Sequence, residues 1–214
     1  TNGTINFCEL RHLKLTHTAA TRGLCATYSG GGGGPFYLTD CECDGFSTLM
    51  NVCYVFLPIV TNCLIKNCAA TTGVFIDVSS GEFANNTFQD NAGSCIYGTN
   101  GSMGTLVVRD NIFDSNKQAI EWRETYGGRL TVTRNTIYGC TTSAVTIVSP
   151  TNATATGLWF TNTNNIIYGN AGYSINSSDT GIDVTTRENR NNAYGGNTSG
   201  NITGISAGTG DVSL

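Results

Sequence analysis

Short polar segments, each with one apolar side chain at a fixed place, recur along this chain. The segment "NNTFQDN" at 85–91 is followed by "DNIFDSN" at 110–116, "RNTIYGC" at 134–140 and "NNIIYGN" at 164–170. In each of them an asparagine precedes an apolar residue by two places. Most carry another asparagine five places after the first. Such recurrence predicts a repeated structural unit.

The repeat extends over most of the chain when the first asparagine is used as the anchor. Successive anchors are 24, 25, 24, 30 and 27 residues apart, a period typical of a solenoid with loop insertions on some coils. The anchors are Asn62, Asn86, Asn111, Asn135, Asn165 and Asn192. Two places on lie Leu64, Phe88, Phe113, Ile137, Ile167 and Tyr194. Five places on lie Asn67, Asn91, Asn116, Cys140, Asn170 and Asn197.

Short strand-like segments fill the rest of each period. They are β-branched and alternating, are separated by Gly, Asn and Ser, and none has helical periodicity over ten residues. We therefore expect each coil to contain several strands, paired in parallel with the next coil about 4.8 Å away. Segments of this kind follow the anchors at 75–78, 95–98, 119–122, 144–148 and 173–176. Others precede the next anchor at 106–108, 130–132, 158–160 and 182–184.

This winding gives the asparagine repeat a structural meaning. The apolar residues two places after the anchors are expected to point inward and stack as a buried column. The asparagines are expected at corners, where left-handed or bridge conformations are needed, and Asn tolerates these best after Gly. A corner asparagine can also hydrogen-bond its equivalent on the next coil, which predicts a ladder.

The repeated segments resemble the right-handed parallel β-helix, or pectin-lyase-like, superfamily of secreted bacterial surface proteins and phage tailspikes. The resemblance covers about residues 36–205 and implies an all-β fold, a right-handed parallel β-helix of about seven coils of roughly 24 residues. We expect one domain over 1–214. Residues 1–35 form an irregular entry that contains a Gly-rich loop, and residues 206–214 form a C-terminal tail.

Composition narrows the possible roles. Charged residues make up 12% of the chain and the formal net charge is −4, which argues against a nucleic-acid surface. No apolar run reaches about 18 residues, so we expect no transmembrane helix. No segment predicts a cofactor site.

Cysteine is abundant and unevenly placed, since seven of nine lie in the first third of the chain. The spacing is poor for metal binding, so no metal site is predicted. A secreted location would permit disulfides. We expect Cys63 and Cys68 on one coil and Cys41, Cys43 and Cys53 on the coils before it, close enough for some pairs to bridge.

The catalytic patterns that the resemblance suggests are missing. Polygalacturonase-like members carry N-T-D, a D-D pair, G-H-G and R-I-K, and none of these occurs here. A different carboxylate pair remains possible on an outer face, because residues that flank the inward ones point outward. The expected row is Asp77, Tyr97, Glu121, Thr146 and Asn176.

Three readings of this row remain open. Asp77 and Glu121, two coils and about 10 Å apart, approach the separation of an inverting glycosidase. Tyr97, Glu121, Arg123 and Tyr126 could bind a sugar without chemistry. The row could also be plain surface. Trp122 and Trp159 are expected in the core or covering a sheet.

These observations predict an extracellular structural or adhesive protein: a surface protein, fibre or tailspike segment that contacts glycans or neighbouring chains without catalysis. The alternative is a polysaccharide lyase or glycoside hydrolase that uses acidic residues on an outer sheet face. Both ends of a β-helix expose unpaired backbone groups, so self-association into a trimer or fibre is also expected.

Overall fold

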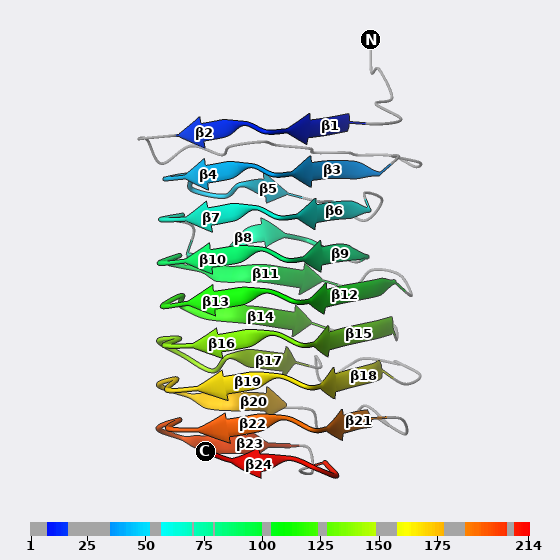
Figure 1. Cartoon of the computed structure of the whole chain (residues 1–214), viewed down its shortest axis with the longest axis vertical. Coiled ribbons are helices and arrows are strands. Elements are labelled where there is room, and N and C mark those ends of the chain that lie inside the picture. The colour runs from blue at the N-terminus through cyan, green and yellow to red at the C-terminus, as the bar shows by residue number, and fades with distance from the viewer. Residues whose placement is uncertain are drawn as a thin grey trace.

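The computed structural model describes residues 8–16, 35–51, 57–69, 71–78, 80–99, 104–123, 128–148, 158–177, 187–204 and 208–214. Within these ranges the chain winds as a parallel β-helix, and its coils stack along the long axis from the N-terminal to the C-terminal end (Figure 1). Each strand pairs in parallel with its equivalents on neighbouring coils, which produces three sheets. The predicted fold class is confirmed.

The three sheets follow one another around each coil. The first contains β1 (Cys8–Arg11), β3 (Phe36–Thr39), β6 (Pro58–Thr61), β9 (Gly81–Ala84), β12 (Thr105–Arg109), β15 (Gly128–Thr133), β18 (Leu158–Thr163) and β21 (Arg187–Arg190). The second contains β2 (Lys14–Thr16), β4 (Glu42–Asp44), β7 (Leu64–Lys66), β10 (Thr87–Gln89), β13 (Ile112–Asp114), β16 (Thr136–Tyr138), β19 (Ile166–Tyr168), β22 (Ala193–Gly195) and β24 (Val212–Ser213). The third contains β5 (Met50–Asn51), β8 (Gly73–Ile76), β11 (Ser94–Thr99), β14 (Gln118–Arg123), β17 (Val145–Val148), β20 (Tyr173–Ser177) and β23 (Gly200–Thr203).

Regular structure reaches beyond the range expected for the coils. Strands β1 and β2 already belong to the first two sheets, although they lie within the predicted irregular entry. Strand β24 pairs with β22 inside the stretch that was expected to be a tail. The glycine run at 30–34 lies outside the described residues.

The inward-facing residues of the second sheet form the predicted apolar column. Phe88, Phe113, Ile137 and Ile167 are fully buried, and the rings of Phe88 and Phe113 stack with centroids 4.8 Å apart. The assignment of Leu64 to this column is wrong, because Ile65 pairs with Phe88 and is the buried residue on that coil. The repeat was therefore read one residue early on its first coil.

The predicted asparagine ladder is present at the corner between the first and second sheets. The Nδ2 of Asn111 donates to Asn135 Oδ1 at 3.0 Å, and Asn135 Nδ2 donates to Asn165 Oδ1 at 3.1 Å. The same oxygens also accept the backbone N–H of the preceding rung, as in the 3.0 Å bond from Asn111 N to Asn135 Oδ1. Each buried carboxamide thus satisfies backbone groups of its neighbours, which the corner leaves without strand partners.

The ladder asparagines themselves do not adopt the left-handed conformation, contrary to our expectation. The residue before each one does: φ is 57° at Asn85, 57° at Asp110 and 54° at Arg134. Asn62 also has a positive φ, of 57°, so it occupies this preceding position rather than a rung. At each turn, therefore, one residue bends the chain through its positive φ, and the next residue supplies the side-chain hydrogen bonds.

A second ladder runs along the corner between the second and third sheets. Asn91 Nδ2 donates to Asn116 Oδ1 at 2.8 Å, and Asn170 Nδ2 donates to Asn197 Oδ1 at 2.8 Å. Cys140 lies between these two segments, and its N–H donates to Asn170 Oδ1 at 2.8 Å. Because a cysteine has no side-chain oxygen, the ladder is interrupted at this coil.

Cysteines replace asparagine at the N-terminal end of the first ladder. The thiol of Cys63 lies 3.4 Å from the carbonyl oxygen of Leu38. The thiol of Cys41 lies 3.6 Å from the carbonyl oxygen of Leu10. Asn86 Nδ2 donates to the equivalent carbonyl on the next coil, that of Val60. Burial raises the pKa of Cys63 to about 11, so the thiol keeps its proton at neutral pH and can donate.

The expected disulfides are not formed among the described cysteines. Six are buried free thiols: Cys41, Cys43, Cys63, Cys68, Cys95 and Cys140. The expected bridges among Cys41, Cys43, Cys63 and Cys68 are therefore wrong, while Cys53 lies outside the described residues. Their shared feature is burial in the coil interior, where a cysteine packs as a small apolar residue.

Candidate functional site

The outer face of the third sheet carries the row in which sequence reasoning placed the candidate site. Tyr97 pairs with Glu121, Glu121 with Thr146, and Thr146 with Asn176 on successive coils. Their neighbours along each strand, such as Ile120 and Trp122, point inward and are fully buried. All four row residues are partly exposed, as alternation predicts.

Asp77 does not belong to this row, so its predicted position is wrong. Phe75 pairs with Ile96, which places Ile76 beside Tyr97. Strand β8 ends at Ile76, Asp77 has a φ of 58°, and the N–H of Val78 then donates to the Tyr97 carbonyl, so Asp77 lies at a break in the alternation. Asp77 and Glu121 therefore do not form a pair of carboxylates two coils apart in one row.

Glu121 is held in place by two neighbours. Its Oε1 accepts hydrogen bonds from Arg123 Nε at 2.9 Å and Nη2 at 2.8 Å. Its Oε2 accepts one from Ser94 Oγ at 3.1 Å, across the coil boundary. The side chain of Glu121 is 16% exposed and that of Arg123 is 50% exposed. The carboxylate is thus oriented and partly covered, while the guanidinium reaches solvent.

Arg123 also contacts the aromatic member of the row. Its guanidinium carbon lies 5.4 Å from the centre of the Tyr97 ring, within the range of a cation–π contact. Burial raises the pKa of Tyr97; the positive charge of Arg123 opposes this shift, and the charges of Glu121 and Asp77 add to it. Asp77 thus remains electrostatically close to the cluster although it lies outside the row. Tyr126, the remaining candidate, lies outside the described residues.

The chemistry available here is hydrogen bonding. Tyr97, Arg123, Thr146 and Asn176 present a phenol, a guanidinium, a hydroxyl and an amide on one face. The described residues contain no group of three or more His, Cys, Asp or Glu side chains that could hold a metal ion. These groups can donate and accept hydrogen bonds along one face of the third sheet.

Sequence reasoning missed an apolar surface on the second sheet, which we call the aromatic strip. Tyr138 and Tyr168 pair across adjacent coils and are 39% and 52% exposed. A hydrogen bond to Asp114 is the largest cause of the raised pKa of Tyr138. The signal was in the repeat, since these side chains come one and three places after the anchors. The strip comprises Ile112, Tyr138, Ile166, Tyr168, Val212 and Leu214.

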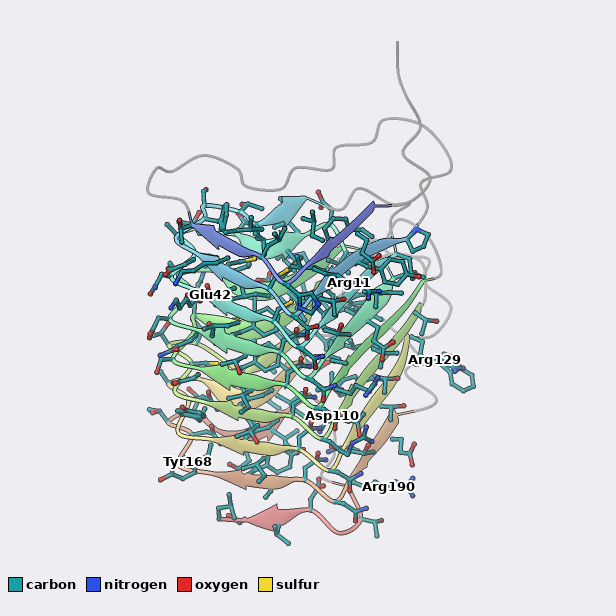
Figure 2. The ribbon with its side chains drawn as sticks, turned by 45° about the horizontal axis from the view of Figure 1, so that its top comes forward. Arg11, Glu42, Asp110, Arg129, Tyr168 and Arg190 are labelled. Carbon is teal, nitrogen blue, oxygen red and sulfur yellow. The ribbon has the colours of Figure 1, made fainter. Side chains whose placement is uncertain are left out.

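A further cluster was missed on the first sheet. Trp122 is buried as expected, but Trp159 is 51% exposed and lies on the outer face. The guanidinium carbon of Arg129 lies 5.3 Å from the centre of the Trp159 ring. In Figure 2, Arg129 and Tyr168 point outward on opposite sides of the coil stack. The two surfaces are therefore independent of each other.

Comparison with known proteins agrees with this geometry. The family model for the right-handed beta helix region matches residues 1–126, more than half of the chain. The chain belongs to the right-handed β-helix family. No curated protein and no solved structure matches the sequence. Membership in the right-handed β-helix family establishes the architecture, whereas function depends on the side chains displayed on it.

Proposed function

We propose that this right-handed β-helix is an extracellular structural or adhesive protein that holds a glycan along its third sheet without catalysis. The supporting observation is the outward row Tyr97, Glu121, Thr146 and Asn176, which continues to Thr203. Neighbouring members lie about 4.8 Å apart, the spacing between paired strands. An extended polysaccharide lying along the helix axis would meet a hydrogen-bonding group at every coil.

The aromatic end of the row supports this proposal. Tyr97 provides a ring against which a sugar can pack, and Arg123 lies over that ring with half of its side chain exposed. Guanidinium N–H groups and the Thr146 hydroxyl can then bond to sugar hydroxyls. Proteins commonly bind ligands by combining an apolar platform with a few placed polar groups.

The state of Glu121 favours binding over hydrolysis. Both of its oxygens already accept hydrogen bonds, from Arg123 and Ser94. A glycoside hydrolase needs two carboxyl groups facing each other across the scissile bond. Asp77 turns out of the row, so the described residues of this row offer a single carboxylate.

A glycan panel tests the proposal. The wild type is expected to retain a neutral or acidic polysaccharide in affinity electrophoresis, and Arg123→Ala is expected to weaken retention about tenfold. Arg190→Ala is the matched control, because Arg190 pairs with Glu188 two residues away, as Arg123 pairs with Glu121, but on another sheet. Equal losses in both variants would refute a specific site.

The same samples distinguish the enzymatic alternative. Reducing ends or unsaturated products are expected to stay at background with every polysaccharide. Product formation that disappears in Glu121→Gln would establish a lyase or hydrolase instead.

The aromatic strip supports association with a neighbouring chain as a second role. Six of the exposed large apolar side chains lie on one face of the second sheet, including Tyr168 and Ile166. Exposed apolar patches of this kind mark interaction surfaces. The proposed form is a trimer or a fibre built through this face.

Sedimentation of the intact chain tests this role. The wild type is expected to associate at micromolar concentration, and the double variant Ile166→Glu, Tyr168→Glu is expected to be monomeric. Thr131→Glu, on the outer face of the first sheet, is the control and should associate as the wild type does. A monomeric wild type would refute the role. In the described ranges no helix qualifies as a membrane span.

A further inference from the structure

The outer face of the first sheet holds an exposed tryptophan beside an arginine that makes no ion pair with any residue the structure describes. Arg129 on β15 pairs directly with Trp159 on β18, and the guanidinium lies over the indole ring with 5.3 Å between its carbon and the ring centre. Trp159 remains 51% exposed with Arg129 in this position. An indole ring so exposed is costly to leave in water, and it offers a flat platform to a ligand.

Three arginines on or beside this face are paired with acids. Arg109 pairs with Glu82 and Asp110, and Arg134 pairs with the same Asp110. Figure 2 shows Asp110 on the corner beside this sheet and Arg190 near its lower end. Arg190 in turn pairs with Glu188 at 2.7 Å.

Arg129 differs from these arginines. Among the described residues it makes no ion pair, and its contact is with the Trp159 ring. Stacking on an aromatic face leaves the in-plane N–H groups of a guanidinium available. Those N–H groups match the two oxygens of a carboxylate, which a guanidinium can bind through two parallel hydrogen bonds.

Hydroxyl groups lie next to this pair. Thr131 and Thr161 pair with each other two residues further along the same strands, and both are partly exposed on the same outer face. Thr105, on the coil before, pairs with Arg129 and is exposed. The surface around the indole ring therefore combines a cation, an aromatic platform and several hydroxyls.

We infer that this surface is a binding site for a carboxylated sugar, a uronate residue within a polysaccharide. The sugar ring packs on Trp159, its carboxylate bonds to Arg129, and its hydroxyls meet Thr131 and Thr161. The site lies on a different sheet from the row that contains Tyr97, and it does not depend on the function proposed for that row.

The single guanidinium beside an aromatic ring favours a uronate over nucleic acid and over a neutral glycan. Nucleic acid requires several clustered cations, but the described residues of this site offer one guanidinium without an acidic partner, in a chain of net charge −4. A neutral glycan would use the indole ring and leave the guanidinium without a partner. A uronate contacts both the indole ring and the guanidinium, because each uronate unit has an apolar ring face and a planar carboxylate.

Two matched probes test the site. Hexameric β-1,4-linked glucuronate and cellohexaose have the same linkage and differ in the carboxylate that stands in place of each hydroxymethyl group. Titration calorimetry is carried out in the Arg123→Ala background, so that the third-sheet row contributes little to the measured affinity. The glucuronate hexamer is expected to bind more tightly than cellohexaose, and the difference should shrink as salt is added.

Variants separate the roles of the two side chains. Arg129→Gln is expected to weaken glucuronate binding about tenfold or more and to leave cellohexaose nearly unchanged. Trp159→Leu should weaken both ligands. Arg190→Gln removes the same charge from the same face and should have little effect.

Three results would overturn the inference. The first is equal affinity for the two hexamers in the parent protein. The second is an equal loss in Arg129→Gln and Arg190→Gln, which would indicate non-specific charge attraction. The third is unchanged glucuronate binding in Arg129→Gln, because the proposed carboxylate contact would then be absent. Circular dichroism of each variant excludes loss of the fold as the cause.

Discussion

Replacing Asn111 with alanine removes one complete rung from the middle of the first ladder. Its Oδ1 accepts hydrogen bonds from Asn86 N at 2.9 Å and Asn86 Nδ2 at 3.0 Å. Its Nδ2 donates to the Phe83 carbonyl at 2.9 Å and to Asn135 Oδ1 at 3.0 Å. All four bonds are buried, and alanine can replace none of them.

The size of the effect follows from these bonds. A buried hydrogen bond contributes about 1 kcal/mol net, so four suggest a loss of about 4 kcal/mol in the free energy of unfolding. Asn86 Nδ2 keeps its bond to Val60, which reduces the loss, while Asn86 N–H is left buried without its acceptor, which increases it. We expect Asn111→Ala to cost about 3–5 kcal/mol.

Urea denaturation followed by far-ultraviolet circular dichroism measures the loss, and hydrogen exchange at the Asn86 amide reports it locally. Asn85→Gly is the control, because Asn85 is exposed, adjacent to the ladder and at a φ of 57° that glycine adopts easily. It should change stability by less than about 1 kcal/mol. If Asn111→Ala costs no more than this control, the ladder does not stabilise the coils as argued.

Three further substitutions test other parts of the fold. Phe113→Ala should cost about 3–5 kcal/mol because its ring is fully buried, whereas Ile112→Ala, 45% exposed, should cost far less; equal shifts in the urea midpoint would contradict the register. Cys140→Asn should restore the missing rung of the second ladder and raise unfolding free energy by about 1 kcal/mol, and a lower midpoint would show that the site cannot hold a carboxamide. The hydrogen bond from Arg134, supported by Arg109, lowers the pKa of Asp110 in the folded protein. The ionised Asp110 therefore adds to the free energy of unfolding at pH values above its unfolded pKa of about 4. This contribution is lost as the pH falls through the lower folded pKa. The stability gap between wild type and Asp110→Asn should therefore close as the solution is acidified, and a gap independent of pH would rule out this ion pair as the cause.

The coil architecture could be predicted because its signal repeats. Phe88, Phe113 and Ile137 hold the same place in successive units, and their alternation with polar residues indicates one inward face. The first coil was misread because asparagine serves two positions at the corner. In "TNCL" (61–64) the single asparagine, Asn62, takes the bending position, and Cys63 takes the rung.

The candidate surfaces were harder to predict because they depend on register between coils. Asp77 looks like part of an alternating strand, but the strand stops one residue earlier, where the chain adopts a positive φ. Arg129 and Trp159 are 30 residues apart in the sequence, and their pairing depends on how much of that interval is loop. The secondary-structure propensity of a segment does not reveal which residues pair between coils, because hydrogen bonds to the neighbouring coils set the register.

The first ladder has a direction, and this restricts how the molecule can change in length. From rung to rung, every internal asparagine accepts from the asparagine or cysteine before it and donates to the residue after it. At one end, Cys63 bonds to the next rung through its backbone N–H alone, and at the other end Asp211 only accepts, from Asn192 Nδ2 at 3.1 Å. Whole coils can therefore be duplicated or deleted among the asparagine-bearing units without leaving a rung unmatched. Cys63 must therefore stay at the N-terminal end of this ladder and Asp211 at its C-terminal end, so gain and loss of asparagine-bearing coils is confined to the part of the stack between them.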